Sequence, residues 1–157
     1  MGYPTDEEFE RARYNRSPPN QMVRKPVRPE VVCLCGSTRF YDEFQRANYF
    51  ETIRGRIVLS VGFFVHSAEV VHGEQLGATP EQKMQLDELH LRKIDLADTV
   101  HFLNVGGYIG KSTRRELAYA LATHKPVTFL EPAMGEKFME DNAHELGRLA
   151  AEFILHS

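Results

Sequence analysis

The sequence predicts an α/β domain, a three-layer sandwich in which helices cover both faces of a mainly parallel sheet of four to five strands. Two observations predict it. Short apolar runs alternate with longer segments of helical periodicity from Glu30 onward, and strands separated by helices form βαβ units. The runs are apolar without interruption, as in parallel strands buried on both faces. A length of 157 residues suits one domain with a full core, and we expect that domain to span residues 30–157.

The first expected βαβ unit begins with the apolar run 31–35. A helix is expected over about 41–54, where Phe44 and other apolar residues recur at helical spacing. A second apolar run predicts a strand over about 56–65.

The next expected helix, over about 80–96, has a well-marked start. Thr79 is the expected N-cap, Pro80 occupies the first helical position and Gln82 stands where a capping box requires it. A third apolar strand is expected directly afterwards, over about 99–105.

The remaining elements continue the alternation. Ser112 is the expected N-cap of a helix over about 113–123. A fourth strand is expected over about 126–130, and one last helix over about 136–155 closes the domain.

Residues 1–29 do not follow this pattern. A short charged helix is expected near 6–13, but the prolines that follow exclude a regular helix or a central strand. We therefore expect a mobile N-terminal arm that can pack on a partner subunit.

Composition narrows the class of protein. The net charge is −3, which gives no support for a nucleic-acid or membrane surface. No apolar stretch approaches the ~20 residues that span a bilayer, and the acidic, polar N-terminal residues are not expected to act as a secretory signal. Cys33 and Cys35 are too close for a good disulfide and are expected to be buried, reduced thiols. We expect a cytoplasmic protein with a small-molecule partner and no nucleic acid or membrane.

Two loops at expected strand ends can hold an anion. In the first, Gly36 permits close backbone approach, Ser37 and Thr38 offer hydroxyl and N–H groups, and Arg39 offers a fork for phosphate. On the residues alone, an ordinary capping turn with an exposed arginine explains this loop equally well.

The second loop, 106–113, ends in the Gly-Lys-Ser-Thr of a P-loop, but Val105 stands where that pattern requires glycine. A nucleotide triphosphatase is therefore disfavoured. N–H groups at the start of the following helix can still bind a monophosphate or sugar hydroxyls.

Glu116 lies one turn into the helix that follows this loop. Acidic residues suit the start of a helix, and that structural role explains the residue well. The position also directs a carboxylate toward the strand-end crevice, where it can stabilise or trap the oxocarbenium-like state of C1′–N cleavage.

Two motifs carry a family resemblance. Cys35-Gly36-Ser37-Thr38-Arg39 resembles the Cys-Gly-Ser-x-Arg signature of 2′-deoxynucleoside 5′-phosphate N-hydrolases. Ala97-Asp98, an apolar strand, a glycine loop and Glu116-Leu117-x-x-Ala120 resemble the second signature of the nucleoside 2-deoxyribosyltransferase superfamily. The resemblance covers about 31–132. It implies a flavodoxin- or Rossmann-like fold, assembly into homodimers or larger homo-oligomers, and Glu116 as the nucleophile.

The resemblance also implies how substrate is held. Ser37 and Arg39, with Gly110 to Ser112, are expected to bind the 5′-phosphate. The substrate-binding residues expected in all are Gly36, Ser37, Thr38, Arg39, His66, Gly107, Tyr108, Gly110 and Ser112. The family's nucleoside-specific members carry Asp where Gly110 stands, which favours a phosphorylated substrate here.

The chain departs from the family at two places. His90 occupies the position of the acid that protonates the leaving base, and Asp87 lies one turn earlier on the same helical face. Either can donate the proton, or Asp87 can orient His90; a partly buried structural histidine is the alternative. The family's tyrosine near the end of the first strand is Cys33 here.

The segment 63–72 offers further candidates. His66, Glu69 and His72 match no standard metal signature, and no metal or cofactor is expected. His66 is expected near the base, on which Phe63, Phe64 or Tyr108 can stack.

The sequence therefore predicts an N-glycosidase that cleaves a (deoxy)nucleoside 5′-monophosphate through Glu116. The alternatives are a nucleoside deoxyribosyltransferase, a non-catalytic nucleotide-binding sensor module, and a phosphoribohydrolase of the cytokinin-activating type.

Overall fold

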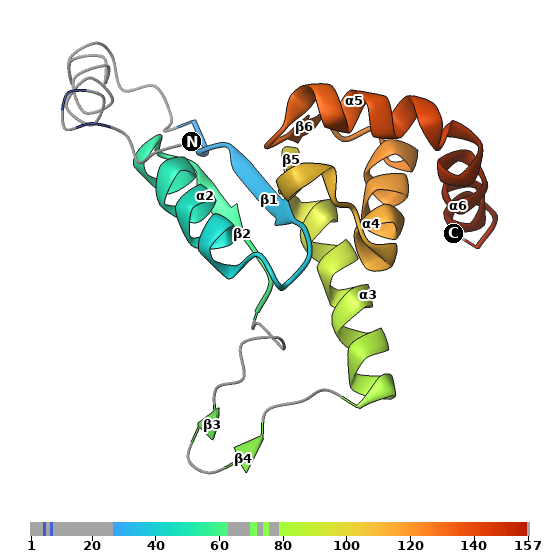
Figure 1. The fold of residues 1–157 in the computed structure, drawn as a ribbon, viewed down its shortest axis with the longest axis horizontal. Helices are drawn as coiled ribbons and strands as arrows, with labels where there is room; N and C mark the ends of the chain where they lie inside the picture. Colours follow the sequence, from blue (N-terminus) through green and yellow to red (C-terminus); the bar gives the residue numbers. More distant parts are fainter. Residues whose placement is uncertain are drawn as a thin grey trace.

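The computed structural model describes the chain in several stretches, which are Thr5, Glu7 and residues 27–62, 70, 71, 74, 75 and 79–156. Its elements, in chain order, are β1 (Val31–Cys35), α2 (Tyr41–Ile53), β2 (Ile57–Leu59), β3 (Val70–Val71), β4 (Glu74–Gln75), α3 (Pro80–Leu96), β5 (Thr99–Phe102), a 3-10 turn η1 (Val105–Gly107), α4 (Lys111–Ala122), β6 (Val127–Phe129), α5 (Pro132–Asp141) and α6 (Ala143–Leu155). Figure 1 shows their arrangement.

The predicted α/β architecture is confirmed. Four parallel strands form one sheet in the order β2-β1-β5-β6, and β3 pairs only with β4, in an antiparallel ribbon. This order corresponds to the first four strands of a flavodoxin-like sheet. None of the described helices is long and apolar enough to cross a membrane.

The order of the strands determines where a ligand site can form. From β1 the chain moves outward to β2, then crosses back past β1 to β5 and β6. The connection that follows β1 leads to β2 on one side, and the connection that follows β5 leads to β6 on the other side. The carboxyl ends of β1 and β5 are level, because Cys35 pairs with Phe102. Open α/β sheets bind ligands at such a crevice.

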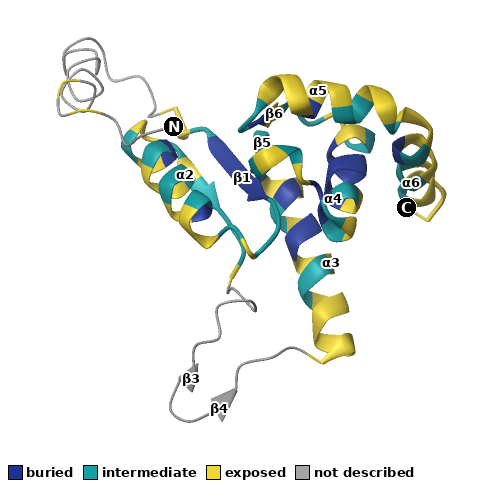
Figure 2. Cartoon of the chain, viewed as in Figure 1, coloured by how far each residue is buried: buried dark blue, intermediate teal, exposed yellow. Residues whose placement is uncertain are grey.

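The side chains of β1 alternate between two cores. Val32 and Leu34 pack with Phe44 of α2, whereas Cys33 and Cys35 belong to the larger core that includes residues of α3, α4 and α6. All five residues of β1 are buried, and Figure 2 shows this burial continuing into α4. A strand buried on both faces is what the uninterrupted apolar run predicts.

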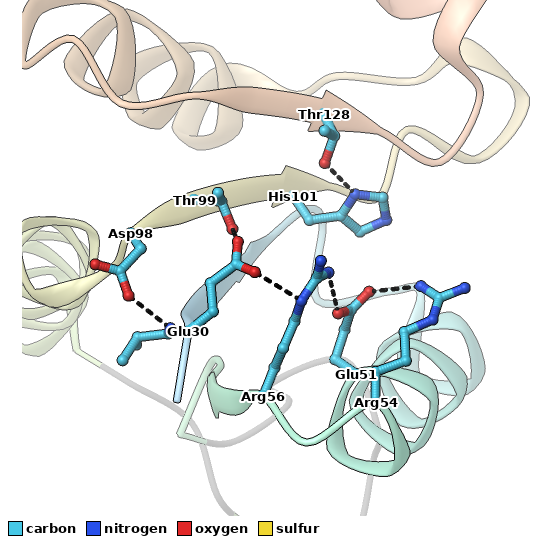
Figure 3. Close-up of polar contacts among 9 residues, drawn as sticks. Glu30, Glu51, Arg54, Arg56, Asp98, Thr99, His101 and Thr128 are labelled. Carbon is cyan, nitrogen blue, oxygen red and sulfur yellow. Dashed lines mark hydrogen bonds and ion pairs between the residues drawn. The ribbon is translucent and has the colours of Figure 1, made fainter. Parts of the chain in front are cut away.

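A polar network occupies the outer part of the sheet, near α2 (Figure 3). Glu51 accepts from Arg56 at 2.6 Å and from Arg54 at 3.3 Å. On β5, His101 Nδ1 lies 2.7 Å from the Thr128 hydroxyl of β6. These groups place polar side chains on the face of the sheet that α2 covers.

The start of the domain is tied to the sheet. Asp98 accepts a hydrogen bond from the backbone N–H of Val31 at 2.8 Å and pairs with Arg28 at 2.7 Å. The proposed arm lies mostly outside the described residues.

Several predicted boundaries are confirmed and others need correction. Both hydrogen bonds of the predicted capping box between Thr79 and Gln82 are present. The second strand ends at Leu59, well before residue 65, and the third at Phe102. Ser112 is not an N-cap: α4 begins at Lys111, with Gly110 as its N-cap and no side-chain capping bond.

The single last helix expected over 136–155 is also wrong. Two helices, α5 and α6, meet at Asn142. The Asn142 side chain donates to the carbonyl of Phe138 at 2.8 Å, and asparagine favours helix ends because its amide competes for backbone groups. Pro132 at the first helical position starts α5 earlier than expected.

Candidate active site

A cavity of about 470 Å³ lies beside the carboxyl ends of β1 and β5. The loop after β1, the start of α4 and one face of α3 surround it. Its lining residues are Gly36, Ser37, Thr38, Arg39, Val61, Gly62, Lys83, Leu86, Asp87, Leu89, His90, Lys93, Tyr108, Gly110, Lys111, Ser112, Thr113 and Glu116. Small-molecule sites have volumes of about 300–1,000 Å³.

The first loop turns tightly before α2 begins. A Cβ on Gly36 would lie 3.2 Å from that of Leu103, so only glycine fits without displacement. The Phe40 N–H donates to the Ser37 carbonyl at 3.0 Å and closes the turn. Arg39 extends over the Tyr108 ring, 4.4 Å from its centroid, and donates to its hydroxyl at 3.3 Å. The two loops are thereby joined by an arginine at the cavity.

The second loop is held from the opposite side by Glu131. Its carboxylate accepts from the Gly107 N–H at 2.9 Å, and its backbone pairs with the buried Asn104 side chain. Gly107 has a φ of 79°, a conformation that glycine adopts readily. The predictions missed Asn104 and Glu131, because no motif marks a contact between residues so far apart in sequence.

The N-terminus of α4 opens on the cavity. Because Gly110 provides no side-chain cap, the first N–H groups of this helix are available to an anion. A Cβ at Gly110 would lie 3.0 Å from the Tyr108 hydroxyl, so a larger residue there would require the Tyr108 side chain to shift.

Glu116 extends from the second turn of α4 to the buried floor of the cavity, where 9% of the residue is exposed. Its Oε2 has no hydrogen-bond partner among the described residues. Burial raises the pKa of this carboxyl to about 7, against an opposing effect of His90. A buried carboxylate with a free oxygen is unusual, since buried polar groups are normally paired.

His90 is buried beneath the cavity, against the two cysteines of β1. It is 5% exposed, and its Nε2 is 3.3 Å from Cys35 Sγ and 3.8 Å from Cys33 Sγ. Both cysteines are buried free thiols, as predicted. Contact with Cys35 lowers the pKa of the Cys33 thiol to about 6, whereas burial raises that of Cys35.

Asp87 lies nearer the mouth, where 35% of its side chain is exposed. Lys83 donates to its carboxylate at 3.0 Å and to the Ser112 hydroxyl at 3.2 Å, which connects α3 to α4 across the cavity. The predictions missed Lys83 and Lys93, although both lie on the same helical face as Asp87 and His90.

The structure therefore brings most of the predicted site residues into one cavity. Gly107 contributes to the loop but does not line the cavity. His66 lies outside the described residues, as do Phe63, Phe64, Glu69 and His72. Comparisons with models of known protein families, with curated proteins and with solved structures found no match.

Proposed function

We propose that this chain is an N-glycosidase that cleaves a (deoxy)nucleoside 5′-monophosphate into free base and sugar phosphate, with Glu116 as the nucleophile. One observation carries the proposal. The buried Glu116 carboxylate and an anion-binding rim open into the same cavity. The family resemblance of the two signature motifs points to the same reaction.

The charge of the lining favours a phosphorylated ligand. Among the described residues, Asp87 and Glu116 are the acids that line the cavity, and the lysines and arginines that line it are Arg39, Lys83, Lys93 and Lys111. Together with the uncapped start of α4, they can bind a phosphate through charge-assisted hydrogen bonds. We therefore assign the 5′-phosphate to the Arg39 side of the cavity, with the anomeric carbon next to Glu116.

Cleavage then takes two steps. The Glu116 carboxylate attacks C1′ while the C1′–N bond breaks, and the electron pair of that bond leaves with the base, which takes a proton from an acid. Water then attacks C1′ of the glycosyl-enzyme ester and gives its proton back to the same acid, releasing the sugar phosphate and restoring Glu116.

Asp87 suits the acid better than His90. Asp87 reaches the open part of the cavity, whereas His90 directs Nε2 at two sulfurs. A bound phosphate would also attract Lys83 and so free the Asp87 carboxyl. We assign His90 a positioning role beneath Glu116.

A nucleoside deoxyribosyltransferase uses the same intermediate, with a second base in place of water. A non-catalytic nucleotide-binding module is a second alternative. It is favoured by two contacts: the His90 ring lies against a thiol, and Asp87 is paired with Lys83.

The test is incubation of the purified protein with ribo- and deoxyribonucleoside monophosphates and with the matching nucleosides. Free base is measured by chromatography, and a glycosyl-enzyme adduct by intact mass. Base release from a monophosphate that is abolished in Glu116→Gln supports the proposal. Glu88→Gln is the control, because Glu88 pairs with Arg92 on the surface of α3. Ligand binding without turnover would instead identify a binding module.

A further inference from the structure

Two sulfurs and an imidazole nitrogen converge beneath the cavity. We propose that Cys33, Cys35 and His90 form a binding site for a thiophilic divalent metal ion such as Zn²⁺. This proposal does not depend on the glycosidase activity, because it concerns metal binding alone.

The spacing of the three ligand atoms fits a tetrahedral ion. Zn–S bonds of ~2.3 Å and Zn–N bonds of ~2.0–2.1 Å put sulfur and nitrogen roughly 3.5–3.6 Å apart. His90 Nε2 lies 3.3 Å from Cys35 Sγ and 3.8 Å from Cys33 Sγ. All three ligand atoms lie within 4.8 Å of one another. Both nitrogen–sulfur distances are therefore within a few tenths of an ångström of the value expected for a bound ion.

The fold holds the ligands in place without a metal. Cys33 and Cys35 are two positions apart on β1, so both side chains extend from the same face. β1 is hydrogen-bonded to β2 on one side and to β5 on the other. His90 is buried on α3, next to the fully buried Leu91 and one turn before the buried Ile94. Central strands and buried helix faces supply ligands with little freedom to move apart.

The cavity gives an ion a route to the site. His90 and Glu116 both line it, and Glu116 lies close enough to Cys35 to raise the pKa of that thiol. We infer that the fourth coordination position opens toward Glu116, whose Oε2 has no hydrogen-bond partner among the described residues and would accept from a water bound to the ion. Two sulfurs and one imidazole select Zn²⁺ and similar ions over Mg²⁺ or Ca²⁺, which prefer oxygen ligands.

The test uses the full-length protein, reduced and stripped of metal with a chelator. Co²⁺ is added as a spectroscopic probe, and Zn²⁺ affinity is measured by competition with a chromophoric chelator. We expect one Co²⁺ per chain, a thiolate-to-cobalt charge-transfer band, the intense visible bands of a tetrahedral site, and loss of these bands when Zn²⁺ is added.

Substitutions then identify the ligands. Cys35→Ser and His90→Gln should each weaken Zn²⁺ binding by more than about 100-fold, since loss of even an outer-shell partner costs 10–100-fold. His101→Gln is the matched control, because His101 is hydrogen-bonded to Thr128 and is not one of the residues that line the cavity above the thiols. Zn²⁺ binding that stays unchanged in both ligand variants would overturn the proposal.

The unmodified protein decides the question even if the variants fail to fold. A charge-transfer band supports thiolate ligation, whereas Co²⁺ binding without that band, or no binding by protein whose thiols are shown to be reduced, overturns it.

Discussion

Two cavities of about 470 Å³ lie in the described part of the molecule, and their volumes do not tell them apart. The candidate site opens at the carboxyl ends of the central strands. The other lies between α2 and the strands β5 and β6, and is lined by none of the predicted site residues. The two cavities differ in whether their buried glutamate is paired with a cation.

Glu51 and Glu116 are buried to nearly the same extent, with 7% and 9% exposed. Glu51 has Arg54 and Arg56 as partners, so its charge is neutralised where it lies. Glu116 has an oxygen without a hydrogen-bond partner in the part of the chain that the structure describes. A buried group left unsatisfied costs stability, and such costs cluster at functional sites. The comparison indicates that the pairing of the buried carboxylate, rather than cavity volume, distinguishes the two cavities.

The largest expected difference between the two buried acids is in the rate of base release. Glu116→Gln should lower base release from a nucleoside monophosphate by at least about a thousandfold, because the amide cannot form the glycosyl ester. Glu51→Gln should retain turnover per folded molecule. Chromatographic rates, normalised to folded protein by circular dichroism, measure both. Equal losses in the two variants would show that the pairing of a buried acid says nothing about catalysis.

Two arginines, one in each cavity, provide the next contrast. Arg39→Ala should raise KM for the monophosphate roughly 10- to 100-fold, since a hydrogen bond to a charged group contributes about 1.5–3 kcal/mol. KM for the matching unphosphorylated nucleoside should hardly change. Arg54→Ala, in the second cavity, is the control and should alter neither. A uniform rise for phosphorylated and unphosphorylated ligands would place the phosphate elsewhere.

The sequence was sufficient for the features that depend on local pattern. The apolar run of β1 predicted a strand buried on both faces, and the two glycine loops converged because parallel strands end at one edge. Contacts between residues that are distant in the sequence could not be predicted. The bridge from Lys83 to Ser112 and the support of Gly107 by Glu131 depend on tertiary packing, as does the depth at which His90 meets the thiols.

The third contrast concerns stability. Glu51→Gln should lower the free energy of unfolding by about 2 kcal/mol, because Arg54 and Arg56 lose the carboxylate that neutralises them. Breaking a fully buried pair costs about 3–5 kcal/mol, and the partial exposure of both arginines, 59% and 35%, reduces that figure. Urea titration at neutral pH measures the difference. An unchanged free energy of unfolding would mean that the network in Figure 3 contributes specificity rather than stability.

The smallest expected effect is on how the free energy of unfolding depends on pH. The native Glu116 carboxyl keeps its proton up to a pH of about 7, against an ordinary value of 4.5. Between these values the native state binds more protons than the unfolded state, so the free energy of unfolding falls as pH rises through that window. Glu116→Gln removes this loss. In metal-free protein, we expect the variant to match the parent near pH 4.5 and to be more stable by about 1 kcal/mol at pH 8, roughly 3 °C in Tm. Thermal unfolding across this range, with chelator present, provides the measurement. A Tm difference that does not change with pH would mean that Glu116 is as well compensated as Glu51, and the distinction between the two cavities would fail.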